Sequence, residues 1–201
     1  MCIRDRFTHG VFATATAAGG GFEAIATVTA AGGESSLSFT SIPGTYASLQ
    51  IRGIARSADA GSSGLLNLYI NLNNDMGSNY SYHYLQGNGS TAAAGGGGSN
   101  TEMVVGTVCR DGFTANTFGA MVIDLHDYAS TTLNKTMRAI GGVDTNGDGN
   151  LRLASSCWLS TSAVTTIKIA LSFGFKAGST FALYGVKAVS YTHLRAHETR
   201  E

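Results

Sequence analysis

The chain has 201 residues, and its 13 Lys and Arg residues balance its 13 Asp and Glu residues, so the formal net charge is zero at neutral pH. This balance leaves no basic footprint for nucleic acid or for an anionic membrane, and we expect neither as a partner. No apolar run approaches the ~20 residues that a membrane-spanning helix needs, so membrane insertion is not expected.

The two ends of the sequence differ in composition from the rest. Residues 1–6 read MCIRDR and residues 190–201 read SYTHLRAHETRE, and both resemble translated sequencing-adapter readthrough. We interpret both segments as artefactual scars and leave them out of the fold prediction. Residues 7–21 are rich in Ala and Gly, which indicates a linker or flexible arm. Residues 22–189 are then expected to form one domain.

The first predicted strands show side chains that alternate between apolar and polar. Residues 22–29, 36–40 and 49–56 follow this period of two, which is typical of strands with one buried face. Pro43 and Gly44 separate the second strand from the third and suit a tight turn, because Pro presets φ and Gly accepts a positive φ.

The middle of the chain contains two further strands and a low-complexity segment. In residues 66–73, four apolar side chains alternate with Asn and Tyr, and in residues 80–86 three tyrosines share one face. Residues 91–100 read TAAAGGGGSN, and this composition predicts a flexible surface loop.

Six more strands are predicted from the same alternation, each bounded by turn residues. They cover residues 102–108, 118–125, 136–143, 151–159, 165–175 and 180–187. In the fifth of them, Ile167, Ile169, Leu171, Phe173 and Phe175 are expected to point one way. About eleven short antiparallel strands, with Gly-rich turns and no sustained helical period, predict an all-β fold of the jelly-roll-like β-sandwich type.

The strand of tyrosines is the candidate ligand-binding site. Tyr80, Tyr82 and Tyr84 alternate along it, with His83 between them, and aromatic faces bind sugar rings or bases at low entropy cost. The alternative interpretation is a tyrosine-rich strand that packs its rings along the rim of the sandwich. A single His without a second His or Cys at ligand spacing does not indicate a metal site.

A second motif matches part of a calcium-binding loop. Asp144, Asn146 and Asp148, followed by Gly149, fit the first six positions of such a loop, but the twelfth position is Ser155 instead of an acidic residue. Strand patterns on both sides favour a turn between two strands. A weak cation site of another type is the alternative interpretation.

No residue cluster indicates catalysis. Asp124, His126 and Asp127 bring two carboxylates near an imidazole, but no nucleophile motif accompanies them, and a solvated strand end is the simpler interpretation. Cys109 and Cys157 match no zinc or redox spacing, so we interpret them as free thiols. We therefore predict a protein that is not an enzyme and needs no cofactor.

Taken in order, several segments resemble a family of short all-β virion proteins of phages, usually described as tail-fibre-like or structural. The resemblance rests on Ser162-Ala163-Val164 after the Trp158 strand and on FEAIATVT, SFTSIPGTYASLQIRGIAR, LYINLNND, NYSYHYLQGNG, ANTFGAMVIDLHDY, NKTMRAIGGVD and GSTFALYGVK. It implies a virion location, a homo-oligomer, contacts with other virion proteins, and host recognition through a surface glycan or protein. It supplies no catalytic or binding residues.

A carbohydrate-binding module of a secreted or cell-surface protein is the alternative function. In that case the tyrosine strand at residues 80–84 would bind the sugar.

Overall fold

A computed structural model describes residues 21–188 of the chain. The predicted scars at residues 1–6 and 190–201 lie outside the described residues, as does nearly all of the predicted arm at residues 7–21. Within residues 21–188, every named element is a β-strand, and no helix there is long and apolar enough to cross a membrane.

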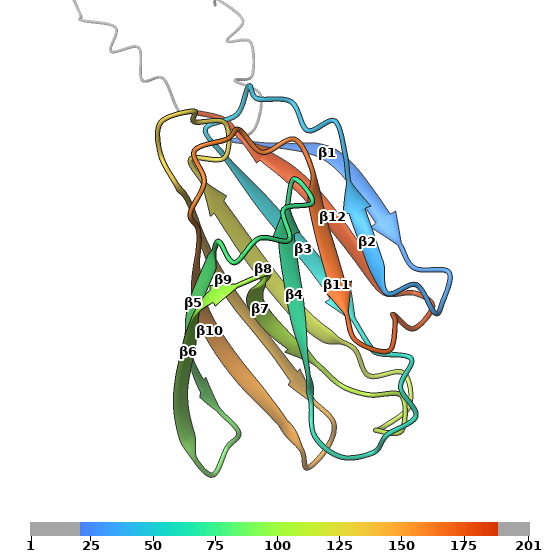
Figure 1. The fold of residues 1–201 in the computed structure, drawn as a ribbon. Helices are drawn as coiled ribbons and strands as arrows, with labels where there is room; N and C mark the ends of the chain where they lie inside the picture. Colours follow the sequence, from blue (N-terminus) through green and yellow to red (C-terminus); the bar gives the residue numbers. More distant parts are fainter. Residues whose placement is uncertain (1–20, 189–201) are drawn as a thin grey trace, which may run out of the picture.

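The described part of the chain contains twelve strands in two antiparallel sheets, so the predicted all-β sandwich is confirmed, with one strand more than expected (Figure 1). The large sheet has the order β1-β12-β3-β8-β9-β10-β5-β6, and the small sheet has the order β2-β11-β4-β7. The strands of the large sheet are β1 (Phe22–Thr29), β3 (Ser48–Ala55), β5 (Tyr80–Gly87), β6 (Ala92–Asn100), β8 (Gly119–His126), β9 (Lys135–Asp144), β10 (Gly149–Trp158) and β12 (Thr180–Val186). Those of the small sheet are β2 (Ser36–Phe39), β4 (Leu66–Leu72), β7 (Met103–Val108) and β11 (Ile167–Leu171).

The core lies between the two sheets and follows the alternation of the sequence. In β9, every second residue from Lys135 to Val143 is buried, and the residues between them face outward. Apolar side chains of both sheets meet in one cluster. Its fully or almost fully buried members include Leu49, Ile51, Leu68, Ile70, Ile123, Leu125, Ile167, Ile169 and Leu183. Each contributes roughly 1.5–3 kcal/mol on burial, which explains why the alternating pattern determines the fold.

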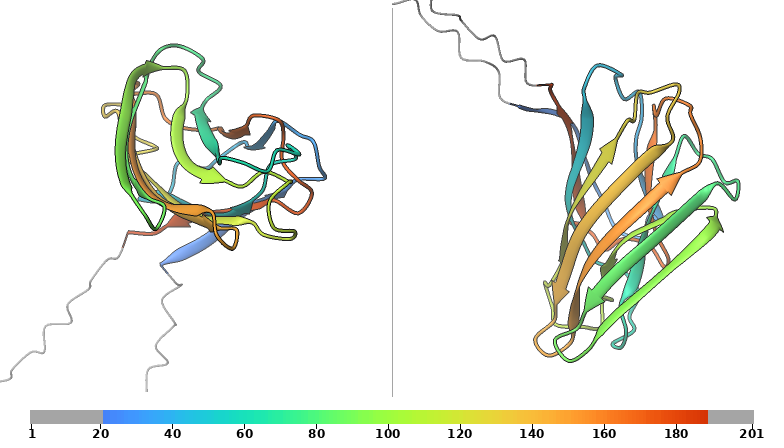
Figure 2. Two further views of the ribbon diagram at one scale, coloured as in Figure 1. Left: turned by 90° about the horizontal axis from the view of Figure 1, so that it is seen from below. Right: turned by 90° about the vertical axis from the view of Figure 1, so that its left-hand side faces the viewer.

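The large sheet curls around one edge of the small sheet (Figure 2). As a result β7 lies inside the curve, where it contacts β5, β9 and β10 in addition to its partner β4. All six residues of β7 are buried. The inner face of β5 and β10 is therefore covered by β7, and their other face is turned to solvent.

Residues 91–100 correct one prediction, because they form strand β6 instead of a loop. The strand pairs antiparallel with β5, which places Gly95, Gly96 and Gly97 beside Tyr84, His83 and Tyr82. A Cβ atom on Gly95 would lie 2.6 Å from Tyr84 Oη, and one on Gly96 would lie 2.5 Å from His83 Cδ2. The aromatic rings of β5 thus cover backbone that has no side chains of its own.

Two segments depart from simple alternation. A bulge after Ala24 in β1 turns both Ile25 and Val28 toward the core. The predicted strand at residues 165–175 ends at Leu171, because Phe173 takes a left-handed backbone conformation with φ 66° in the turn that follows. The prediction for Phe173 was wrong: its side chain is 68% exposed, whereas Phe175 is buried as expected.

Candidate functional site

The solvent-facing side of the large sheet, called the outer face here, is the candidate site. Its side chains form three rows that run across β5, β10, β9, β8 and β3. The register of the strands gives a polar row of His83, Ser155, Arg138, Asp124 and Gln50. A second row consists of Leu85, Leu153, Ile140, Val122 and Arg52. The third row consists of Gly87, Leu151, Gly142, Ala120 and Ile54.

The second and third rows expose large apolar side chains. Leu85, Leu151, Leu153, Ile140 and Ile54 are each between 45% and 60% exposed, and they come from four strands of one sheet. Single exposed apolar residues are common on soluble proteins, but a continuous apolar area on one face marks an interaction site. The outer face therefore has the character of a contact surface.

The polar row is ordered by bonds among its own members. Arg138 Nη2 lies 3.2 Å from Asp124 Oδ2, and Gln50 Nε2 donates to Asp124 Oδ1 at 2.8 Å. Arg52 Nε in turn donates to Gln50 Oε1 at 2.6 Å. The Arg138 side chain is 64% exposed, so this ion pair adds little to stability, and most of its guanidinium is free to contact another molecule.

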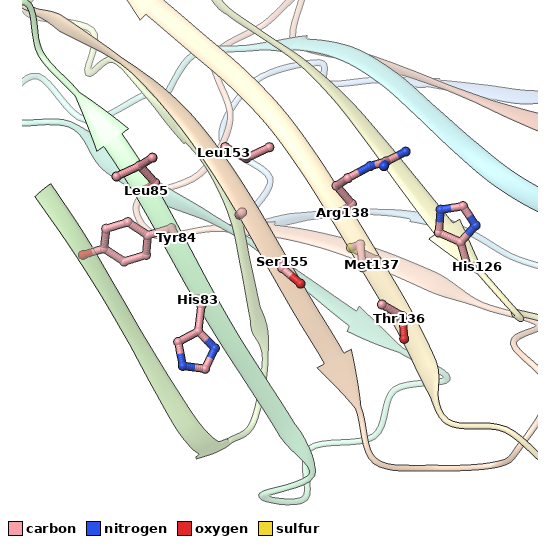
Figure 3. A pocket seen from close by; sticks show the side chains of 10 residues that line it. His83, Tyr84, Leu85, His126, Thr136, Met137, Arg138, Leu153 and Ser155 are labelled. Atoms are coloured by element: carbon pink, nitrogen blue, oxygen red, sulfur yellow. The ribbon is translucent and has the colours of Figure 1, made fainter. Parts of the chain in front are cut away.

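Two shallow hollows lie at opposite ends of the outer face. One has a volume of about 450 Å³ and lies beside Leu85 and Leu153, with His83, Arg138 and His126 around it (Figure 3). The other has a volume of about 640 Å³, and its lining includes glycines of the β9–β10 turn and of residues 87–89 together with Leu151 and Phe118. The first end of the face thus carries basic and bulky side chains, and the second end carries glycines and the carboxylates of Asp144 and Asp148.

The structure separates the four residues of the predicted tyrosine site. Tyr80 is fully buried, stacks on Trp158 with ring centroids 6.2 Å apart, and donates through its hydroxyl to the backbone oxygens of Leu72 and Asp75. Burial raises the pKa of Tyr80 to about 12. Tyr80 is therefore a core residue and cannot be part of a ligand-binding site on the surface.

Tyr82 and Tyr84 lie on one face of β5, and His83 lies on the other. The rings of Tyr82 and Tyr84 are half-buried on the inner side and stack at 6.4 Å with planes 12° apart, whereas His83 points to the outer face (Figure 3). The guanidinium of Arg152 lies 4.2 Å from the Tyr84 ring centre and donates to Gln86 Oε1 at 2.9 Å from Nε. The two tyrosines are thus part of a layer between the sheets.

Arg152 supplies the charged side chain of this layer. It is buried, and its Nη1 donates to Asn67 Oδ1 of β4 at 2.9 Å, so it ties the large sheet to the small one. Burial lowers the pKa of Arg152. Because amide oxygens satisfy the guanidinium, the layer works as a cross-link within the sandwich.

The calcium-like motif forms the turn between β9 and β10, as the strand patterns predicted. Asp144 Oδ1 accepts from the backbone N–H of Asn146 at 2.8 Å, and Asp148 Oδ1 accepts from that of Gly149 at 2.8 Å. Each carboxylate thus stabilises the turn locally. Across the described residues, no three His, Cys, Asp or Glu side chains gather in a way that could hold a metal ion.

The Asp124, His126 and Asp127 segment lies at the end of β8. Asp124 is bonded to Arg138 and Gln50 as described, His126 is exposed, and Asp127 has a positive φ of 56° in the following turn. The two cysteines at positions 109 and 157 are free thiols, the first buried and the second partly buried.

Comparison of the chain with protein-family models, with curated proteins and with solved structures found no match. We therefore infer function from the outer face itself. Its apolar rows were missed from the sequence because no single strand shows them. They become visible only when the register places Leu85, Leu153 and Ile140 side by side.

Proposed function

We propose that this chain is a non-enzymatic structural module of a phage virion and that it assembles through the outer face of its large sheet. The observation that carries the proposal is the row of exposed Leu and Ile side chains on that face. The assignment to a phage virion is supported by the resemblance of the segments between residues 22 and 187 to tail-fibre-like virion proteins.

The exposed side chains are sufficient to hold an assembly together only if most of the face is covered. Full burial of a Leu or Ile contributes roughly 1.5–3 kcal/mol. The five half-exposed residues would then contribute about 4–8 kcal/mol per face, whereas association costs about 4–15 kcal/mol. A single charged residue in the middle of the face should therefore be enough to prevent assembly.

The test compares two leucines that are about equally exposed. Leu153 is 49% exposed on the outer face, and Leu133 is 53% exposed in the loop before β9. We expect Leu153→Lys to weaken association at least tenfold in sedimentation velocity runs across a concentration series, and Leu133→Lys to leave it unchanged. Equal behaviour of the two variants, or a parent chain that stays monomeric and also binds no other virion protein, would refute the proposal.

Host recognition is part of the proposal and is assigned to loops instead of strands. The loops of a sandwich can change their contact chemistry without disturbing the core, and this chain has loops rich in Gly, Asn and Ser. Genes for tail or baseplate proteins next to this reading frame would support the virion assignment. Neighbours that encode only metabolic enzymes would count against it.

Carbohydrate binding is the second candidate function. The specific observation in its favour is the parallel pair of Tyr82 and Tyr84, whose rings are only partly buried on the inner side of β5, beside β6. Stacked aromatic rings of this kind bind the apolar faces of sugars.

A further inference from the structure

The two ends of the outer face differ in a way that suits pairing with themselves. The geometry points to a two-fold contact between two copies of this chain, in which each end of the outer face packs on the opposite end of its partner. This inference rests on the proposed assembly function and specifies the partner as a second copy. It is supported by two independent features of the face, one of shape and one of charge.

The shape of the face repeats along three strands. On β5, β9 and β8, a large outward side chain lies two residues from a glycine or alanine. The pairs are Leu85 with Gly87, Ile140 with Gly142, and Val122 with Ala120. The register aligns the three large residues in the second row and the three small ones in the third.

Consider a two-fold axis that runs perpendicular to the strands and parallel to the sheet, between the second and third rows. Rotation about this axis exchanges the two rows. Each strand then faces its own counterpart in antiparallel orientation, because this rotation reverses the strand direction and keeps the lateral order. Ile140 of one copy would lie over Gly142 of the other, and Leu85 would lie over Gly87. On β5, β9 and β8, each large side chain thus meets a position where the partner has little or no side chain, as close packing requires. On β10 the rotation places Leu153 against Leu151, and on β3 it places Arg52 against Ile54, so these two strands add contacts between large side chains.

The charges of the face obey the same symmetry. β9 is the fifth of the eight strands, and the axis passes it at the level of Gly141. Arg138 and Asp144 both face outward on β9, three residues before and three residues after that level. The rotation therefore places Arg138 of each copy against Asp144 of the other. It also brings the end of the face that carries His83 over the glycine-lined hollow beside Asp148.

These features favour a second copy over an unrelated partner. A two-fold contact uses the same patch on both subunits, so the patch must be complementary to itself under one rotation. The pairs of Ile140 with Gly142 and of Arg138 with Asp144 satisfy this condition with one axis. If the partner were an unrelated protein, there would be no reason for either pair to be symmetric about Gly141.

Charge exchange tests the contact directly. Arg138→Asp would place like charges opposite each other at two symmetric positions, and so would Asp144→Arg. We expect either change to raise the dimer dissociation constant about tenfold or more in sedimentation equilibrium, and the double variant to restore it to within about threefold of the parent. Failure of the double variant to recover association would overturn the inference, as would single variants with no effect.

Two controls isolate the contact between copies. Leu133→Lys adds a charge in the loop before β9, outside the three rows of the outer face, and should leave association unchanged. Lys168→Asp reverses a charge on β11 of the small sheet, away from the outer face, and should also have no effect. Far-ultraviolet circular dichroism of every variant reports whether the fold is intact, and a thermal unfolding curve confirms it.

The outcome also separates this inference from the proposed function. If Leu153→Lys abolishes association while the charge variants behave like the parent, the outer face is an assembly surface with another geometry or partner, and only the two-fold contact fails. If Leu153→Lys and the charge variants all leave association unchanged, both proposals fail.

Discussion

The glycines of β6 provide the sharpest test of the fold. A Cβ atom on Gly95 would lie 2.6 Å from Tyr84 Oη and 2.7 Å from its Cζ, whereas one on Gly98 would meet no atom within 4 Å. Gly95→Ala therefore has to displace the Tyr84 ring, and Gly98→Ala does not. The two substitutions are chemically identical and lie three residues apart on the same strand, so their difference isolates the contact with Tyr84.

The cost of displacing this ring follows from the contacts it makes. Its stacking on Tyr82 at 6.4 Å contributes about 0.5–1.5 kcal/mol, and the guanidinium of Arg152 at 4.2 Å adds about 0.5–2 kcal/mol. Loss of both predicts that Gly95→Ala lowers the free energy of unfolding by about 1–3 kcal/mol. Gly98→Ala should be neutral or stabilise by up to about 1 kcal/mol, because it removes freedom from the unfolded chain.

Urea unfolding followed by the fluorescence of Trp158, the single tryptophan, measures both variants. A Tyr84→Ala background completes the test: once the ring is gone, Gly95→Ala should no longer be costly. Equal free energies of unfolding for Gly95→Ala and Gly98→Ala would refute the reasoning, and they would favour the loop that the sequence predicted for residues 91–100.

The remaining predictions concern two tyrosines of β5. Burial raises the folded pKa of Tyr80 to about 12, above the ordinary tyrosine value of about 10, so the folded state holds this proton more tightly. Its contribution to stability is complete below pH 10 and is lost as the pH rises toward 12, by up to about 2–3 kcal/mol. Tyr80→Phe should be less stable than the parent at neutral pH, because it loses the hydrogen bonds of the hydroxyl. In denaturant titrations its free energy of unfolding should fall less than that of the parent between pH 10 and 12, and an equal fall in both proteins would contradict this. For the second candidate function, a glycan array should show binding by the parent that Tyr82→Ala reduces at least tenfold, and a parent chain that binds no glycan would exclude it.

The sequence predicted the parts of the fold that depend on alternating apolar side chains. The strand that carries Leu68 and Ile70 and the strand that carries Ile167 and Ile169 were both found, because burial on one face leaves a period of two. β6 was missed because four consecutive glycines carry no such period. The signal for β6 lay in its partner, where Tyr82, His83 and Tyr84 supply the rings that cover the glycines.

The candidate site was predictable only in part for a related reason. Alternation correctly placed Tyr82 and Tyr84 on one side of β5 and His83 on the other. It could not show that the tyrosine side faces β7, since that depends on how the large sheet curls around the small one. The apolar outer face was equally invisible, because Leu85 and Leu153 are neighbours only through the pairing of β5 with β10.

Radical footprinting tests most directly whether the outer face is a contact surface. Hydroxyl radicals label exposed Leu, Ile and Phe side chains, and mass spectrometry can compare labelling at concentrations below and above the midpoint of association. We predict that Leu85, Leu153 and Ile140 become protected in the assembly. Phe173, which is 68% exposed and lies in the turn after β11, should be labelled equally at both concentrations. Unchanged labelling of the three outer-face residues in a chain that has associated would contradict this prediction.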